Sequence, residues 1–221
     1  EKNVLDRWII SRLNQTIKEI TFCLNSFDAF VAAQKIEGFV NDLSVWYVRR
    51  SRERVGPAIG NNEDKISCYK TLYRVLMILC KILAPFTPFL AEEIYQNLTR
   101  ENFRNEKKSV HLEDWPEFKE NLIDQELEKQ MEKVRKICEL GHAARKEFKV
   151  KVRQPLSKIT IINLESELEQ ELKNLVKDEL NVKEVETKKG KGELRVKLDI
   201  KITPELRAEG EARELIRQIQ D

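Results

Sequence analysis

The residues best able to do chemistry form a basic cluster at the end of one predicted helix. The cluster falls within six positions and consists of Arg49, Arg50, Arg52 and Arg54. Six consecutive helical residues sweep more than a full turn, so some of these guanidinium groups must face solvent. Arginine is always charged, binds phosphate through a planar fork and stacks on flat rings. Because Trp46 and Tyr47 lie just before the cluster, we predict an RNA contact here that includes Trp46.

This first basic cluster also has a purely structural interpretation. Cations in the last turn of a helix complement the negative end of its dipole. Only Glu53 opposes the four arginines within the cluster. Composition alone leaves both interpretations open.

A second basic cluster follows the longest predicted helix. Its five cations accompany a single acid, Glu147, and are Arg145, Lys146, Lys149, Lys151 and Arg153. Phe148, Val150 and Val152 alternate with the last three cations, so an extended strand would present the charges along one edge. Such an edge suits a phosphate backbone. The alternative, an edge strand protected from aggregation by lysines, stays open.

The remaining sequence shows little that resembles an active site. It has no Gly-rich phosphate loop and no nucleophile motif, and neither His111 nor His142 sits among convergent acids. The cysteines lack the spacing of a metal site and occur singly, as Cys23, Cys68, Cys80 and Cys138. No apolar run approaches the length of a membrane span. We therefore expect no catalytic residue, no bound metal and no membrane partner.

The composition is typical of a soluble, helix-rich protein. The 221 residues are 41% hydrophobic and 35% charged, with few glycines and prolines. The formal net charge is only +2, so any nucleic-acid footprint must come from local clustering. The chain also lacks an initiating Met and stops within a helical pattern, so we expect a piece of a longer protein.

Hydrophobic periodicity predicts four helices in the first half of the chain. They cover about 4–24, the stretch from Asp28 to the first basic cluster, about 66–83, and the residues from Pro88 onwards. In the second helix the inward stripe is predicted as Ile36, Val40, Leu43 and Tyr47. The third begins near Ile66 and is apolar on more than one side through Tyr69, Leu72 and later residues, as expected of a central bundle helix. Short connections make this an antiparallel helical bundle over residues 1–123. Within it, a charged loop over 99–108 follows the fourth helix.

The second half of the chain predicts a different architecture. A long helix over about 120–148 precedes strands over 158–163, 182–187 and 193–201, with a short helix over 166–177 between the first two. A turn over 188–192 and a last helix to about residue 220 complete the pattern. The fold class is therefore mainly α, with a helical bundle followed by a small α+β module over 124–221.

Several stretches together resemble the C-terminal half of the isoleucyl-tRNA synthetases, a family of class I aminoacyl-tRNA synthetases. The resemblance spans nearly the whole chain. The matching stretches are Leu5-Asp6-Arg7-Trp8-Ile9, Ser11-Arg12-Leu13, Asn41-Asp42-Leu43-Ser44, Trp46-Tyr47-Val48-Arg49-Arg50, Leu83-Ala84-Pro85-Phe86-Thr87-Pro88-Phe89, Ala91-Glu92-Glu93-Ile94-Tyr95, Ser109-Val110-His111-Leu112, Trp115-Pro116, Val152-Arg153-Gln154-Pro155-Leu156 and Thr203-Pro204-Glu205-Leu206-Arg207-Ala208-Glu209-Gly210.

The resemblance implies an α-helical anticodon-binding domain over about 1–123 and the start of a C-terminal extension after it. The parent would activate isoleucine with ATP and Mg²⁺ and transfer it to tRNA(Ile), using catalytic and editing domains whose signatures do not occur here. The resemblance thus implies that this piece is inactive alone, holds no cofactor, and acts as a cytoplasmic monomer on tRNA(Ile). It favours RNA contact for the first basic cluster.

Two alternatives from other classes remain. The chain could be a helical scaffold that docks protein partners, or the arginines could bridge to the catalytic domain without touching RNA. Salt dependence separates RNA binding from apolar docking, because RNA binding weakens steeply as phosphate contacts are screened.

Overall fold

The computed structural model describes residues 3–56, 62–99, 108–164, 166–190 and 192–220. The chain divides into two compact units, residues 1–128 and 129–221. The division lies inside a helix, whereas the sequence placed the domain boundary at residue 123. Most of the loop predicted over 99–108, and Lys191 in the turn predicted over 188–192, lie outside the described residues.

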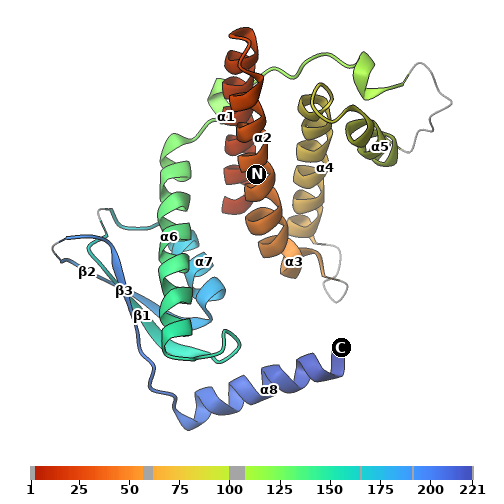
Figure 1. Cartoon of the computed structure of the whole chain (residues 1–221). Coiled ribbons are helices and arrows are strands. Elements are labelled where there is room, and N and C mark those ends of the chain that lie inside the picture. Colours follow the sequence, from red (N-terminus) through yellow and green to blue (C-terminus); the bar gives the residue numbers. More distant parts are fainter. Residues whose placement is uncertain (1–2, 57–61, 100–107, 165, 191, 221) are drawn as a thin grey trace. The chain divides into compact units, whose positions relative to one another are not determined.

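The first unit is a bundle of helices, as predicted. Its long elements are α1 (Val4–Asn25), α2 (Ala29–Asn41), α4 (Glu63–Leu83) and α5 (Pro88–Thr99), with the π-helical stretch η1 (Asp42–Val48) and α3 (Arg49–Val55) continuing α2. Two short 3₁₀ turns follow, η2 (Val110–Leu112) and η3 (Glu120–Leu122). α1 packs against both α2 and α4 (Figure 1). The core of the unit therefore lies along α1.

Hydrogen-bonded caps close both ends of α1. Asn3 caps its start by accepting a hydrogen bond from the Leu5 amide at 2.9 Å. At its other end Phe27 adopts a left-handed conformation with φ of 58°. The Asp28 amide then donates to the Cys23 carbonyl at 2.9 Å, and the Phe27 amide to Leu24 at 3.0 Å. This is a Schellman motif with phenylalanine where glycine is usual.

The inward stripe of the second helix differs from the predicted one. Phe39 is fully buried, whereas Val40 is 38% exposed, so the prediction that Val40 faces inward was wrong. Phe39 also lies three positions after Ile36 and four before Leu43, so it fits the same stripe. Trp46, predicted to lie beside solvent, is buried as well. The basic end of the helix therefore follows a buried aromatic pair, Trp46 and Tyr47, and not an exposed one.

The second unit is a small α+β module, as predicted. Its elements are α6 (Gln125–Glu147, which begins in the first unit), β1 (Leu156–Ile162), α7 (Gln170–Leu180), β2 (Val182–Lys188), β3 (Arg195–Leu198) and α8 (Pro204–Gln220). The sheet order is β2-β1-β3, with β1 parallel to β2 and antiparallel to β3. The central strand β1 buries Ile159 and Ile161, and α7 buries Leu172 and Val176. The middle strand and α7 thus hold the core of this unit.

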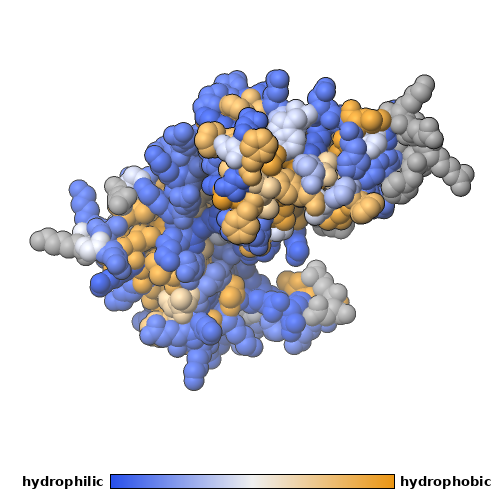
Figure 2. All heavy atoms as spheres, turned by 45° about the horizontal axis from the view of Figure 1, so that its top comes forward, coloured by the Kyte–Doolittle hydropathy of each residue, from blue (hydrophilic) through white to orange (hydrophobic). Residues whose placement is uncertain are grey.

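The surface mixes charged residues with exposed hydrophobic ones. Hydrophilic residues cover much of the visible face in Figure 2, and hydrophobic residues gather in patches between them. Phe22, Phe27 and Phe30, around the turn from α1 to α2, are each more than two-thirds exposed. Within the described residues, no helix is both long enough and apolar enough to span a bilayer.

Candidate nucleic-acid interface

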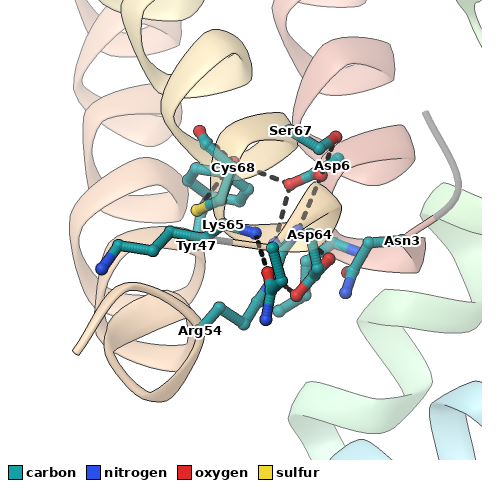
Figure 3. A network of polar contacts seen from close by, with 10 residues as sticks. Asn3, Asp6, Tyr47, Arg54, Asp64, Lys65, Ser67 and Cys68 are labelled. Carbon is teal, nitrogen blue, oxygen red and sulfur yellow. Dashed lines mark hydrogen bonds and ion pairs between the residues drawn. The ribbon is translucent and has the colours of Figure 1, made fainter. Parts of the chain in front are cut away.

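Arg54, the last arginine of the first basic cluster, forms a clamp with two aspartates (Figure 3). Its Nη1 and Nη2 atoms donate to the two carboxylate oxygens of Asp6, each at 2.8 Å. Its Nε and Nη2 atoms also donate to Asp64, at 2.8 and 2.7 Å. Asp6 comes from α1 and Asp64 from the start of α4, so one guanidinium joins three helices. We call this set of residues the Arg54 clamp.

Two hydroxyl groups complete the environment of the buried Asp6 carboxylate. Tyr47 donates to Asp6 Oδ1 at 2.8 Å, and Ser67 donates to Oδ2 at 3.2 Å. Burial raises the pKa of Tyr47, and its hydrogen bond to Asp6 raises it further. Burial opposes the charge of Arg54, but hydrogen bonds to Asp6 and Asp64 outweigh it and raise the arginine pKa. Both groups therefore keep their protons, and the clamp is a fixed structural element.

The clamp changes the assignment of Arg54 and Trp46. The Arg54 side chain is only 11% exposed, and its fork is occupied by carboxylates, so it does not fit the predicted role in RNA contact. Trp46 is buried, with the Arg49 guanidinium 5.9 Å from its ring centroid. Its ring therefore supports Arg49 by a cation–π contact and is not presented to a base.

Two arginines of the first basic cluster remain well exposed. Arg49 and Arg52 are exposed on α3, while Arg50 is half-buried. Arg49 Nε donates to the Val45 carbonyl one turn earlier at 2.8 Å, which orients its guanidinium. The structure thus brings Arg49 and Arg52 together on the surface of one anchored helix end.

Arg145, the first residue of the second basic cluster, is 1% exposed. Its five N–H groups donate to four backbone carbonyls at distances from 2.6 to 3.1 Å, those of Lys151, Gln154, Leu180 and Asn181. Two of these carbonyls lie at the C-terminal end of α7, where the helix dipole favours a cation. Burial lowers the Arg145 pKa to about 10. The residue therefore organises the fold, and the predicted RNA contact does not fit it.

The extended strand predicted for residues 148–153 was wrong. These residues form turns after α6, and Lys149 has a left-handed φ of 56°. The Val150 amide donates to the Arg145 carbonyl and the Lys149 amide to that of Lys146, which again makes a Schellman motif. The loop curls because the buried Arg145 guanidinium binds two of its carbonyls.

The rest of the second basic cluster lies at the surface of this curled loop. The exposed cations are Lys146, Lys149, Lys151 and Arg153. Arg153 pairs with Glu214 of α8 at 3.5 Å. Phe148 and Val152 are about half exposed, so charges and apolar groups share one surface and do not separate onto two strand edges.

Helix α4 carries surface residues that the sequence interpretation missed. Tyr69 was predicted as one of the apolar positions of a central bundle helix, but it is 51% exposed, and Ile66 and Tyr73 are 46% and 49% exposed. Lys70 is exposed beside them, and Arg74 is half-buried. The signal was present in the sequence, since Tyr69/Tyr73 and Lys70/Arg74 are both spaced by four residues and form neighbouring stripes on a helix.

Several stretches that carried the family resemblance have structural roles. Asp6, from the first stretch, belongs to the Arg54 clamp. Arg12, from the second, pairs through its guanidinium with Asp42 of η1 and Glu128 of α6, each at 3.0 Å. Ser11 donates to Glu128 and accepts from the Asp124 amide at 2.8 Å. These contacts bind the start of α6 to the bundle. They also explain why the first unit extends to residue 128.

The described residues include no group of three or more His, Cys, Asp and Glu side chains placed to hold a metal ion. The four cysteines are free thiols, three of them buried. Burial raises the pKa of the Cys80 thiol to about 11. This thiol therefore stays protonated and packs as a small apolar side chain.

Comparison with known proteins gives the class of this domain. A sequence model of the family described as the anticodon-binding domain of tRNA ligase matches residues 6–161. The chain belongs to this family. The match begins at Asp6 of the Arg54 clamp and runs through α6 into β1, so it includes parts of both compact units.

Similar curated proteins include isoleucine–tRNA ligases, which confirms the predicted resemblance. The protein from Clostridium tetani is 45% identical over 184 residues, covering 83% of this chain and 18% of that protein. The Dehalococcoides mccartyi (strain CBDB1) protein is 40% identical over 233 residues, covering 98% of this chain and 23% of that protein. The Pyrococcus abyssi protein is 43% identical over 210 residues, covering 92% of this chain and 19% of that protein. The chain spans about a fifth of the length of these relatives.

Proposed function

We propose that this chain binds the anticodon stem and loop of tRNA(Ile) and positions that tRNA for aminoacylation by the catalytic domain of an isoleucine–tRNA ligase. Membership of the anticodon-binding family and the similarity to isoleucine–tRNA ligases support the proposal. The observation that carries it is the pair of exposed arginines, Arg49 and Arg52, on a helix end that the Arg54 clamp holds in place.

Local charge supports an RNA partner at this end of the first unit. Residues 49–74 contain seven arginines and lysines but only three acids, Glu53, Glu63 and Asp64. Arg54 pairs with Asp64 and also with Asp6, which lies outside this stretch. The stretch has a surplus of four positive charges, or three once Asp6 is counted, against a net charge of +2 for the whole chain. A local positive field of this kind attracts a phosphate backbone and speeds its association.

The proposed mechanism separates positioning from identity. Arg49 and Arg52 bind phosphates and set the register of the stem. Phosphate contacts carry no sequence information, so these two arginines do not read the identity of the anticodon. The exposed cations of the second basic cluster add backbone contacts. The rigid helices then hold the tRNA so that its acceptor end reaches the catalytic domain, an effect of position on a distant reaction.

The parent protein supplies the chemistry in this proposal. ATP and Mg²⁺ bind its catalytic domain, an editing domain removes misacylated valine, and the present chain alone is inactive and needs no cofactor. The chain acts as a cytoplasmic monomer within that parent. The relatives' names support the aminoacylation reaction as the parent's activity.

A second candidate function is docking of a protein partner without RNA contact. The exposed apolar residues Leu215, Ile216 and Ile219 on α8 favour it, as does the phenylalanine group at the α1–α2 turn. In a variant of this idea, Arg49 and Arg52 bind the catalytic domain of the parent. Either function predicts that tRNA affinity is weak and insensitive to these arginines.

Titration of the chain with tRNA(Ile) and with the same tRNA carrying an altered anticodon, at several salt concentrations, tests the proposal. The test variant is Arg49→Ala with Arg52→Ala. The matched control removes the same charge from exposed arginines elsewhere, Arg195→Ala with Arg207→Ala. Each lost phosphate contact lowers the slope of log K against log salt by about 0.7–0.9.

The proposal expects salt-sensitive binding that prefers the cognate anticodon, weakens in the test variant and persists in the control. If binding is salt-sensitive but does not prefer the cognate anticodon, only the backbone-positioning part of the proposal is supported. Absence of binding, or equal loss in both variants, contradicts the assignment of Arg49 and Arg52.

A further inference from the structure

Helix α4 presents an aromatic stripe and a basic stripe side by side on its exposed surface. Tyr69 and Tyr73 are separated by one turn, and so are Lys70 and Arg74. The two tyrosines are each about half exposed. Side chains four residues apart on a helix lie one above the other, so each stripe is a short row along the helix axis.

The two tyrosines differ from the other tyrosines of the chain. Tyr47 and Tyr95 are buried, and their hydroxyls donate to Asp6 at 2.8 Å and to Glu113 at 2.9 Å. Those side chains fill the core and hold helices together. Tyr69 and Tyr73 instead show about half of their surface to solvent at successive turns of α4. Stacking platforms for unpaired bases need such adjacent, accessible ring surfaces.

A shallow groove of about 530 Å³ runs along the same helix. Its lining includes Ile66, Lys70 and Arg74 of the exposed side, together with Glu63, Ser67 and Thr71. Volumes of this order suit small ligands. Glu63 is the acid of this lining, and the nearby Asp64 is paired with Arg54. Lys70 and Arg74 therefore leave the groove with more positive than negative side chains.

Charge distinguishes this surface from the exposed phenylalanines at the α1–α2 turn, Phe22, Phe27 and Phe30. The phenylalanines at the α1–α2 turn lie in a stretch, residues 18–37, with two lysines and three acids. Both lysines are paired, Lys18 with Glu120 and Lys35 with Glu19. That end has no positive surplus to attract RNA, whereas residues 49–74 carry a surplus of four. Of these two surfaces, α4 is the one whose charge fits a nucleic acid.

We propose that this face of α4 binds the unpaired loop of the RNA, with bases stacked on Tyr69 and Tyr73 and phosphates held by Lys70 and Arg74. The inference rests on the proposed function and adds where loop bases are held. The arginines of α3 would contact the stem, and α4 would contact the loop. Stacking tolerates any base, so this surface contributes affinity and loop order more than sequence choice.

The experiment compares two RNA probes with the full 221-residue chain at fixed salt. One probe is a hairpin with the anticodon stem and loop of tRNA(Ile), and the other is the same stem as a duplex without a loop. The test variant is Tyr69→Leu with Tyr73→Leu, which keeps apolar bulk but removes the rings. Tyr69→Phe with Tyr73→Phe keeps the rings. Circular dichroism and urea midpoints check that each variant is folded.

The leucine pair should bind the hairpin at least about tenfold more weakly, because each stacking contact contributes about fivefold or more to affinity and two rings are removed. The phenylalanine pair should stay within about twofold, and the duplex should bind all variants alike. Lys70→Gln with Arg74→Gln should lower the salt slope by about 1.4–1.8, the value for two phosphate contacts.

A matched aromatic control, Phe22→Leu with Phe30→Leu, should leave hairpin binding unchanged. If this control weakens binding and the tyrosine variant does not, loop bases lie at the α1–α2 turn and the inference is overturned. If the wild type binds the hairpin but the leucine pair binds equally well, the inference fails while the proposed function stands. If the wild type binds neither probe, the proposed function itself fails.

Discussion

Replacing Arg54 by alanine should destabilise the chain strongly, although the sequence predicted Arg54 as one of the RNA-contacting residues of the first basic cluster. The Asp6 carboxylate is fully buried and receives two of the four hydrogen bonds that Arg54 makes. Without Arg54, its remaining partners are the hydroxyls of Tyr47 and Ser67. Asp64 is 47% exposed and can turn to water instead.

The magnitude follows from the buried partner. Removing one member of a buried ion pair costs about 3–5 kcal/mol, because the other charge stays buried without compensation. The neighbouring variant Arg52→Ala removes an exposed arginine from the same helix and should cost less than about 0.5 kcal/mol. The contrast between Arg54 and Arg52 therefore measures burial and not arginine chemistry.

Urea unfolding followed by circular dichroism provides the assay, with Arg54→Lys and Asp6→Asn as additional variants. Lysine keeps the charge but not the fork, so it should recover only part of the loss. The double variant Asp6→Asn with Arg54→Ala should be less destabilised than the sum of its single variants, because the buried charge is gone.

RNA binding by the Arg52→Ala variant completes the test, because this variant should lose tRNA affinity and not stability. If Arg54→Ala costs less than about 1 kcal/mol, or if the double variant is simply additive, the reasoning from a buried and clamped Asp6 is refuted.

Three other predictions concern stability. Phe27→Gly should raise the free energy of unfolding by about 0.5–1 kcal/mol, because glycine accepts the left-handed φ of 58° without strain. Phe30→Gly, inside α2, should lower the free energy of unfolding. Shifts of the urea midpoint in the same direction for both variants would contradict this. Arg145→Met should cost about 3 kcal/mol or more by leaving four backbone acceptors without their donor, whereas the exposed Lys146→Met should be nearly neutral in thermal unfolding. The hydrogen bonds from Arg54 lower the pKa of Asp64, so this carboxylate stabilises the fold above its unfolded pKa of 3.8, and that contribution is lost as the pH falls through the lower folded value; urea midpoints measured between pH 5 and 2.5 should fall less in Asp64→Asn than in the wild type.

Much of the fold could be predicted from the sequence because the signals are local. Asn3 and Asp28 cap helices through their own side chains, and Pro88 begins α5. Alternating and helical periodicities placed the strands and helices of the second unit to within a few residues. The curled loop after α6 was mispredicted, since its shape depends on Arg145 binding carbonyls that include one 35 residues away.

The candidate site was predicted only in part. The clusters were found because charge density is visible in the sequence, but Tyr69 was placed in the core because helical periodicity cannot say which faces of a helix find partners. In α4, contacts with α1, α3 and α5 leave the side with Tyr69 and Tyr73 uncovered. An aromatic residue on an apolar helix was thus counted as core when it lies at the surface.

The sequence by itself determined the helical bundle, the α+β module, the family and the positions where cations gather. Only the tertiary structure decided which of these cations are available to a partner. Arg54 and Arg52 are two residues apart, yet one binds an aspartate 48 positions earlier while the other is exposed. Arg145 and Lys146 are adjacent, yet only Arg145 lies where the carbonyls at the end of α7 meet. Burial depends on what packs from distant parts of the chain, and composition carries no record of that packing.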